Sequence, residues 1–335
     1  MKLRRQSVPI GLAVAALQMA PLVVHRACAE TLPVPQVTAQ DEQQEPVEIV
    51  TGPWGSKPGQ FGKVDDASRP GPMDFALHGD TLYVLDPVNA RVQLFGLDGG
   101  FRQEIPIGTR TADFMCVDED GNVTVLDAFV RREVKTFSDS GGLVSQAGLP
   151  ASLGLPSAVF ADNGRLLIEE RHNRVFELDV PQDERGQPAR VAGSRNGRPA
   201  ATGGHTLHAA KSGTHDVVIR ADGRQTRHDP ITLRFVRPVA SIVALESDDR
   251  GWTYVATACQ RDGGDKWKTD LILVGIDAEG GITPPIGLPN AYVTDHYRKL
   301  LVTGSGDVMQ MQTTEDGVRF VRWTLPATQN GGESR

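Results

Sequence analysis

The sequence predicts an all-β fold: a single six-bladed β-propeller of four-stranded blades, with a ring closed by strands from both chain ends. Short alternating apolar segments recur with a period of about 40 to 45 residues, the period of a propeller blade. Each copy contains turns rich in Gly, Asp and Asn, which is typical of hairpins. No amphipathic segment of about 10 to 15 residues separates the predicted strands, which argues against α/β architectures.

The clearest repeat unit is the segment 75–95, FALHGDTLYVLDPVNARVQLF, which is interpreted as strand, turn, strand, turn, strand. A second copy, FMCVDEDGNVTVLDAFVRREVKTF, covers 114–137 and places Asp127 one period after Asp86. A third copy, AVFADNGRLLIEERHNRVFEL, covers 158–178 and places Glu169 at the same position, two periods after Asp86. Later copies match only by pattern; the last, 300–325, keeps alternating apolar residues but lacks the repeated Asp and Arg.

The first hairpin turn of each unit is predicted to contain a glycine. The spacing between these glycines is nearly constant up to Gly164, widens before Gly213 and narrows after it. The widest spacing, from Gly251 to Gly306, includes the polar insertion 260–268, QRDGGDKWK, which is interpreted as an extended loop of the fifth unit. Six turns predict six blades. The six glycines are Gly79, Gly121, Gly164, Gly213, Gly251 and Gly306.

The segment 1–29 has the three parts of a secretory signal peptide: a cationic start, an apolar stretch, and the small-x-small sequence Ala27-Cys28-Ala29. We expect cleavage after Ala29 and a periplasmic or secreted protein with no stable membrane span. A transmembrane anchor and a lipid-bearing Cys28 fit less well. The pair Arg4-Arg5 leaves both general secretion and twin-arginine export open.

The remaining chain divides into three segments. Residues 30–46 are rich in Pro, Gln, Thr, Val and Glu without apolar periodicity, and are predicted to be a disordered linker. The propeller is predicted over 47–325, and 326–335 form a polar tail. Ring closure is expected from 47–51 or from 52–62, either of which can complete the last blade.

Charge and cysteine content limit the classes of function. Cleavage leaves 31 basic and 42 acidic residues, a net charge of −11, which argues against a nucleic-acid partner because phosphate binding needs clustered Lys and Arg. Only Cys116 and Cys259 remain. They fall in different predicted blades, so we expect two buried thiols rather than a disulfide.

The repeats resemble NHL repeats, most specifically in Tyr83-Val84-Leu85-Asp86, Asn89, Arg91-Val92 and Phe95. The resemblance covers the first three units well, roughly residues 72 to 180, and the later units only by pattern. It implies a propeller ring closed by strands from both ends of the chain.

An acid and an arginine recur at matching positions of these three units, at the end of one central strand and the start of the next. We interpret them as structural, pairing or hydrogen-bonding between neighbours, since a bidentate arginine adds geometry as well as energy. These positions are Asp86, Arg91, Asp127, Arg132, Glu169 and Arg174. The apolar residues between them are predicted to pack blade against blade: Val84, Leu85, Val125, Leu126, Leu167 and Ile168.

The run Glu169-Glu170-Arg171-His172 is the densest ionisable segment, and it supplies the two candidate binding residues, Glu170 and His172. In the functional interpretation both face a pocket at one mouth of the ring, where the acid tunes the imidazole. In the structural interpretation the segment is a solvated turn between strands.

The sequence predicts no metal site and assigns no cofactor. The segment 118–122 begins like a calcium loop, but the position of the bidentate acid is occupied by Phe129, so a hairpin turn is the better interpretation. His205 and His208 are three apart on a predicted strand and therefore point to opposite faces. No nucleophile elbow, phosphate loop or HExxH motif occurs.

Two functions remain open. The first is an exported binding or interaction module that holds a protein or small-molecule ligand on a propeller face. The second, implied only by resemblance to NHL and related six-bladed propellers, is a metal-dependent lyase or lactonase-type hydrolase with its site at the axis. Three or more His, Asp or Glu side chains converging on the axis would favour the enzyme.

Overall fold

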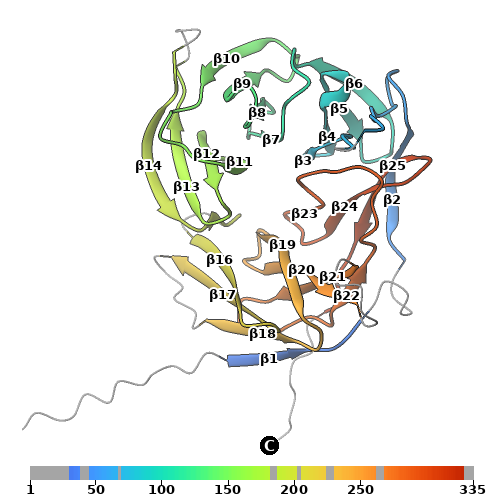
Figure 1. The fold of residues 1–335 in the computed structure, drawn as a ribbon, viewed down its shortest axis with the longest axis vertical. Helices are drawn as coiled ribbons and strands as arrows, with labels where there is room; N and C mark the ends of the chain where they lie inside the picture. The colour runs from blue at the N-terminus through green and yellow to red at the C-terminus, as the bar shows by residue number, and fades with distance from the viewer. Residues whose placement is uncertain are drawn as a thin grey trace, which may run out of the picture.

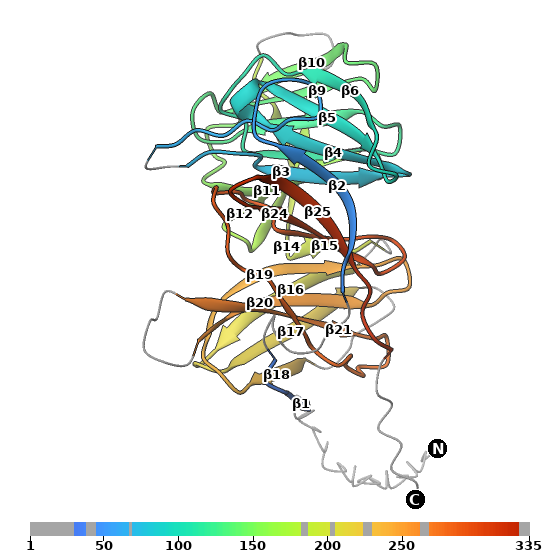
Figure 2. The ribbon, with the colours of Figure 1, turned by 90° about the vertical axis from the view of Figure 1, so that its right-hand side faces the viewer.

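The computed structural model describes residues 30–37, 45–66, 69–181, 187–201, 205–223, 230–261 and 268–327. Six β-sheets surround a central axis, which confirms the six-bladed β-propeller (Figure 1). Seen from the side, β5, β6, β9 and β10 lie at one end of the molecule and β16, β17 and β18 at the other (Figure 2).

The blades follow chain order. Blade 1 contains β3 (Asp74–His78), β4 (Thr81–Asp86), β5 (Arg91–Gly96) and β6 (Phe101–Pro106), with the short 3-10 helix η1 (Pro87–Asn89) after β4. Blade 2 contains β7 (Phe114–Val117), β8 (Val123–Asp127), β9 (Glu133–Phe137) and β10 (Leu143–Gly148). Blade 3 contains β11 (Pro156–Asp162), β12 (Arg165–Glu170), β13 (Arg174–Asp179) and β14 (Arg190–Asn196).

The second half of the ring is less regular. Blade 4 contains β15 (Arg198–Pro199), β16 (His205–Ser212), β17 (Asp216–Gly223) and β18 (Ile231–Phe235), with β1 (Glu30–Val34) added beyond β18. Blade 5 contains β19 (Val239–Ser247), β20 (Thr253–Gln260), β21 (Thr269–Ile276) and β22 (Ile286–Leu288). Blade 6 contains β23 (Leu300–Val302), β24 (Val308–Thr313), β25 (Gly317–Trp323) and β2 (Val47–Pro53).

The second strand of a blade explains how the core is built. Successive side chains of a strand point to opposite faces, so Val84 of β4 packs toward blade 6 while Leu85 packs toward blade 2. Both side chains are fully buried. The fourth strand, β6, is mostly exposed. Each blade is therefore most apolar near its second strand, and the predicted packing residues are all buried.

Strand β2 closes the ring by pairing antiparallel with β25, which confirms the first of the two predicted closures. Three buried aromatic rings pack behind this pairing: the centroid of Phe320 lies 5.3 Å from that of Phe75 and 6.2 Å from that of Phe61. The joint between the two chain ends is thus part of the hydrophobic core.

The expected disordered linker is wrong for residues 30–34, which form β1 and pair parallel with β18. Val34 is 1% exposed and packs with Leu32 and Val37 against the core of blades 4 and 5. The parallel ladder and this burial together outweigh the low apolar periodicity of the segment. The predicted signal peptide and the polar tail beyond residue 327 lie outside the described residues.

Replacing Val34 by aspartate should lower the free energy of unfolding by about 2–4 kcal/mol, because it places an unpaired carboxylate in the blade 4 core. The matched control is Thr31→Asp on the same strand, where the side chain is exposed and little change is expected. Urea unfolding of both variants compares them. Equal stability of the two variants would mean that β1 is not docked.

Five of the six predicted glycines lie in the turn between the first and second strands of their blade, and all six have positive φ, between 57° and 89°. Gly213 is the exception. It joins β16 and β17, which are the second and third strands of blade 4. The irregular glycine spacing on either side of Gly213 therefore reflects the different position of this turn within blade 4.

Cys116 and Cys259 are free and buried, as expected. Burial raises the pKa of the Cys116 thiol. The insertion 260–268 lies between β20 and β21, and residues 262–267 of it lie outside the described residues. Among the residues that the structure describes, no helix is long and apolar enough to cross a membrane.

Candidate functional site

The seam between blades 3 and 4 differs from the other five seams of the ring. Five hydrophobic clusters of buried residues join blades 1 and 2, 2 and 3, 4 and 5, 5 and 6, and 6 and 1. No such cluster joins blades 3 and 4 in the described part of the chain. Leu167, on the second strand of blade 3, is buried but belongs to none of the five. A polar contact replaces apolar packing here.

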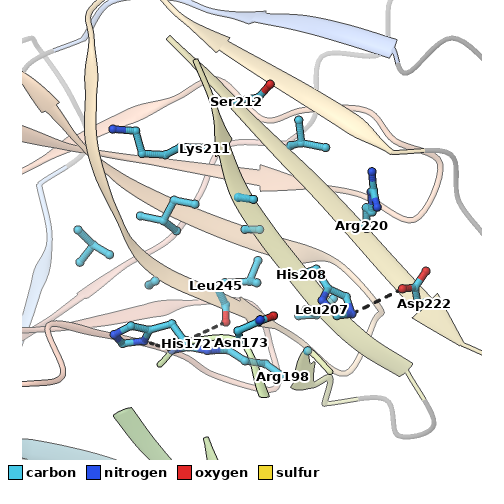
Figure 3. Close-up of a pocket in the computed structure, with 17 residues that line it drawn as sticks. His172, Asn173, Arg198, Leu207, His208, Lys211, Ser212, Arg220, Asp222 and Leu245 are labelled. Atoms are coloured by element: carbon cyan, nitrogen blue, oxygen red, sulfur yellow. Dashed lines mark hydrogen bonds and ion pairs between the residues drawn. The ribbon is translucent and has the colours of Figure 1, made fainter. Parts of the chain in front are cut away.

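The innermost strand of blade 4 is nearly absent. Strand β15 has two residues, which pair with Leu207 and Thr206 of β16, whereas the innermost strands β11 and β19 of the neighbouring blades have seven and nine. A cavity of about 560 Å³ lies beside β16, between residues 207–212 of that strand and residues 242–245 of β19. We call this space the blade 4 cavity; Figure 3 shows the side chains around it.

The blade 4 cavity combines an apolar wall with basic groups. The apolar wall consists of Leu207, Ala209, Ala210, Val218, Ile242, Val243, Ala244 and Leu245. The ionisable lining residues are His172, Arg198, His208, Lys211, Arg220 and Asp222. Five side chains that carry or can accept positive charge thus face one carboxylate. In a protein with a net charge of −7, this is a local reversal of sign.

Most of the basic groups already have a partner within the protein. Lys211 Nζ donates to the carbonyl of Ala240 at 3.1 Å, and His208 Nε2 lies 3.5 Å from a carboxylate oxygen of Asp222. Arg220 of β17 lies beside His208 in the ladder (Figure 3). Its guanidinium has no hydrogen bond or ion pair to any described residue. Arg220 is therefore the basic group most available to a ligand.

An ion pair spans the seam at the base of the cavity. Arg198 Nε and Nη2 contact the two carboxylate oxygens of Glu169 at 2.6 and 2.9 Å, which is a bidentate pair. His172 Nδ1 lies 3.4 Å from a carboxylate oxygen of Glu169. The hydroxyl of Ser157 also donates to Glu169, at 2.9 Å. Burial alone would raise the pKa of Glu169, but the hydrogen bonds of His172 and Arg198 and the charge of Arg198 lower it to about 2.

This low pKa predicts an acid-sensitive contribution to stability. The folded-state pKa of Glu169 lies below its ordinary value of 4.5, so the unfolded chain binds more protons between pH 4.5 and 2. About 2–3 kcal/mol of stability, present above pH 4.5, should be lost as the pH falls toward 2. Urea unfolding should show that Glu169→Gln destabilises the protein at pH 6 and that its difference from wild type shrinks below pH 4. A constant difference would contradict the assignment.

The two predicted binding residues are placed differently. His172 lies in the turn after β12, is exposed and lines the blade 4 cavity. Glu170 is half-buried, and its carboxylate lies beside Gly154 rather than in that lining. The acid that contacts His172 is Glu169, which the sequence assigned to the structural repeat. The segment 169–172 thus contains a carboxylate–imidazole pair, but it is formed by Glu169 and His172 rather than by Glu170 and His172.

The repeated acid and arginine positions form one direct pair of the three. Arg91 Nε lies 3.2 Å from Asp86, and Arg91 also donates to three carbonyls of the segment 56–60. Asp127 instead accepts from Thr111 and from the backbone of the next turn. Arg132 donates to carbonyls of the connection between blades 2 and 3. Arg174 donates to Ser194, and Glu169 pairs with Arg198 instead.

Another buried ion pair joins the innermost strands of several blades. Arg298 Nε contacts Asp74 of β3 at 2.7 Å, and Arg298 Nη1 lies 3.5 Å from Glu246 of β19. Asp74 also accepts hydrogen bonds from the backbone of Met115 and Phe75. These contacts join blades 1, 2 and 5 across the ring. A smaller cavity of about 350 Å³ adjoins this pair and shares Arg198 with the blade 4 cavity.

The histidines do not assemble into a ligand set. His205 and His208 lie on the same strand, as predicted, and His228 lies outside the described residues. His296 is largely buried; burial and the charge of Lys299 lower its pKa to about 4. Within the described ranges, no group of three or more His, Cys, Asp and Glu is placed to hold a metal ion. The turn 118–122 is held by Asp118, which accepts from the backbone of Asp120 and Asn122.

The residues of β16, β17 and β19 that line the cavity were not predicted from the sequence. The only signal for them was the irregular glycine spacing around Gly213. Arg198 carried no signal because it lies outside the repeated motif. The cavity exists because the innermost strand of blade 4, β15, is only two residues long, and no sequence motif marks this shortening.

Comparisons with known proteins support the fold class alone. No family model and no curated protein matches this chain. Among solved structures, the chain is similar to a gluconolactonase from Xanthomonas campestris, at 16% identity and a TM-score of 0.48, over 84% of this chain and 98% of that one. It is also similar to an exported protein from Bacteroides fragilis, at 10% identity and a TM-score of 0.48, over 90% and 100%.

A third similar structure is virginiamycin B lyase from Staphylococcus aureus, at 13% identity and a TM-score of 0.43, over 78% of this chain and 87% of that one. Similarity at this level carries no information on the function of this chain.

Proposed function

We propose that this chain is an exported binding module that holds its ligand in the blade 4 cavity. The observation that carries the proposal is the replacement of one hydrophobic seam by a cavity of about 560 Å³ with an apolar wall and five basic side chains. Ligand sites are concave, mostly apolar and equipped with a few polar groups that fix orientation. The blade 4 cavity has this composition.

Export and the NHL-like description are part of the same proposal. Export rests on the signal-peptide pattern of residues 1–29, and the description rests on the sequence of blades 1 to 3. The chemistry of the cavity favours binding over catalysis, because the one carboxylate in its lining, Asp222, lies against His208, and Glu169 at its base is paired with Arg198. No observation favours the lyase or lactonase alternative.

The proposal is tested with a variant in which a large side chain fills the blade 4 cavity. Ala210 lies on β16 with its side chain exposed to the cavity, so Ala210→Trp should block it without disturbing the blade core. The mature protein, residues 30–335, is screened by amide NMR against a library of small acids, sugars and short peptides. We expect shifts at residues 206–212 and 242–245 that disappear in Ala210→Trp.

The matched control is Ala151→Trp, an exposed alanine in the connection between blades 2 and 3, which should bind like wild type. Ligands whose shifts map to another face of the ring would refute the proposal. So would ligands that bind Ala210→Trp as well as they bind wild type.

A further inference from the structure

Beside the blade 4 cavity, one edge of β16 has no strand partner among the described residues. The carbonyl of His205 accepts from the backbone of Ala200, so it points toward β15. In an antiparallel ladder, alternate residues direct their N–H and C=O groups to the same neighbour. The same side of β16, toward β15, therefore also receives the backbone N–H and C=O groups of Leu207, Ala209 and Lys211. Leu207 pairs with β15, whereas Ala209 and Lys211 have no strand partner on this side among the described residues.

The missing partner has a defined length. In blades 1, 2, 3 and 5 the innermost strand pairs along most of the second strand; β19, for example, pairs with β20 from end to end. In blade 6, the three residues of β23 pair with the first half of β24. In blade 4 the segment 208–212 lacks this partner, which is about 15 Å of strand. An extended segment of four or five residues would fit along it, between β16 and residues 242–245 of β19.

The charges beside this edge favour an acidic occupant. Arg220, His208 and Lys211 lie on β16 and β17, and His172 and Arg198 approach from blade 3. Asp222 is the one carboxylate in the lining and already lies against His208. Ile242 of β19 packs with Leu207 and Ala209, which lie on the opposite face of β16 from His208, and would contact the side chains between the acidic ones.

We propose that the blade 4 cavity takes an extended acidic peptide segment of a partner protein, which adds to β16 as the missing innermost strand of blade 4. The proposal rests on the proposed function and names the ligand class. In this mode of recognition the main-chain hydrogen bonds supply affinity, and pockets for alternate side chains supply specificity. Arg220 provides the anchor for a carboxylate.

The experiment uses a five-residue blocked peptide of alternating glutamate and valine, titrated into the mature protein by calorimetry. Two versions are N-methylated at alternate amides, one at the odd residues and the other at the even ones. Only every second N–H of an added strand points toward β16. We expect one version to lose about 10-fold or more in affinity and the other to bind within about twofold of the parent peptide.

Protein variants test the charge. Arg220→Glu should weaken binding of the glutamate–valine peptide by about 10- to 100-fold. Arg190→Glu is the matched control, because Arg190 is an exposed arginine of β14 outside the cavity lining, and it should bind like wild type. A peptide of alternating lysine and valine should not compete.

Three results would overturn the proposal: no binding of the peptide, equal binding of the two N-methylated versions, or displacement of the peptide by a small dicarboxylate that binds the cavity more tightly. The last result would leave the proposed function standing with a small-molecule ligand. Failure of Ala210→Trp to affect any ligand would instead refute the proposed function itself.

Discussion

Replacing Arg298 by methionine should lower the free energy of unfolding by about 3–5 kcal/mol at pH 7. Methionine keeps the apolar stem but leaves Asp74, which is 2% exposed, without its cationic partner. Removing one member of a buried ion pair costs this much because it leaves an uncompensated charge. Urea unfolding of residues 30–335 measures the loss.

A pH series identifies the cause of the loss. Burial raises the pKa of Asp74 above its ordinary value, while Arg298 and two backbone N–H groups oppose the rise. Without Arg298 the folded state should bind a proton on Asp74 more readily than the unfolded chain does. Stability of the variant should therefore recover, relative to wild type, as the pH falls. A loss that does not depend on pH would indicate lost packing alone.

The exposed pair of Arg102 and Asp80 provides the control. Its nitrogen–oxygen distance of 2.6 Å is as short as that of the buried pair, but both side chains are open to solvent. Exposed ion pairs are screened by water and salt and contribute little. We expect Arg102→Met to unfold at nearly the urea concentration of wild type.

Replacing Phe320 by alanine should cost about 3–5 kcal/mol, because it opens a cavity at the joint of the two chain ends. Phe320 is fully buried between Phe61 and Phe75, and it lies on β25, the strand that pairs with β2. Loss of this ring weakens the contact that holds the propeller closed. Urea unfolding measures the change, and hydrogen exchange should become faster at the amides of β2 than at those of β8.

Phe101→Ala is the control, since Phe101 lies on an outer strand and is 38% exposed. We expect a loss below about 1 kcal/mol there. If the two variants were equally stable, or if β2 kept its protection in Phe320→Ala, closure of the propeller would not depend on this cluster.

The architecture was predictable because its signals are local and repeated. Glycine tolerates positive φ better than other residues, so Gly79, Gly121 and Gly164 identify the hairpin turns directly. Short apolar runs between turns identify strands buried on both faces, as in β4 and β8. The repeat then predicts the ring, and strands from the two chain ends close it where β2 pairs with β25.

The departures from regularity were not predictable because each depends on a contact distant in the sequence. Glu30–Val34 has no repeat pattern, and it becomes a strand only because β18 offers an edge. Glu169 occupies the position of Asp86 but pairs with Arg198, far along the chain, instead of Arg174. The candidate site shares this origin: of the residues that the sequence proposed, His172 reaches the cavity, and Glu170 does not line it.

We propose that the blade 4 cavity is the ligand site of this propeller. A crystal structure of residues 30–335 with the tightest ligand from the NMR screen tests this claim. The claim predicts electron density for the ligand beside Ala209, Ala210 and Lys211 of β16, with an acidic group at Arg220. Density for that ligand at the axis or on an outer face, with the blade 4 cavity empty, would contradict it.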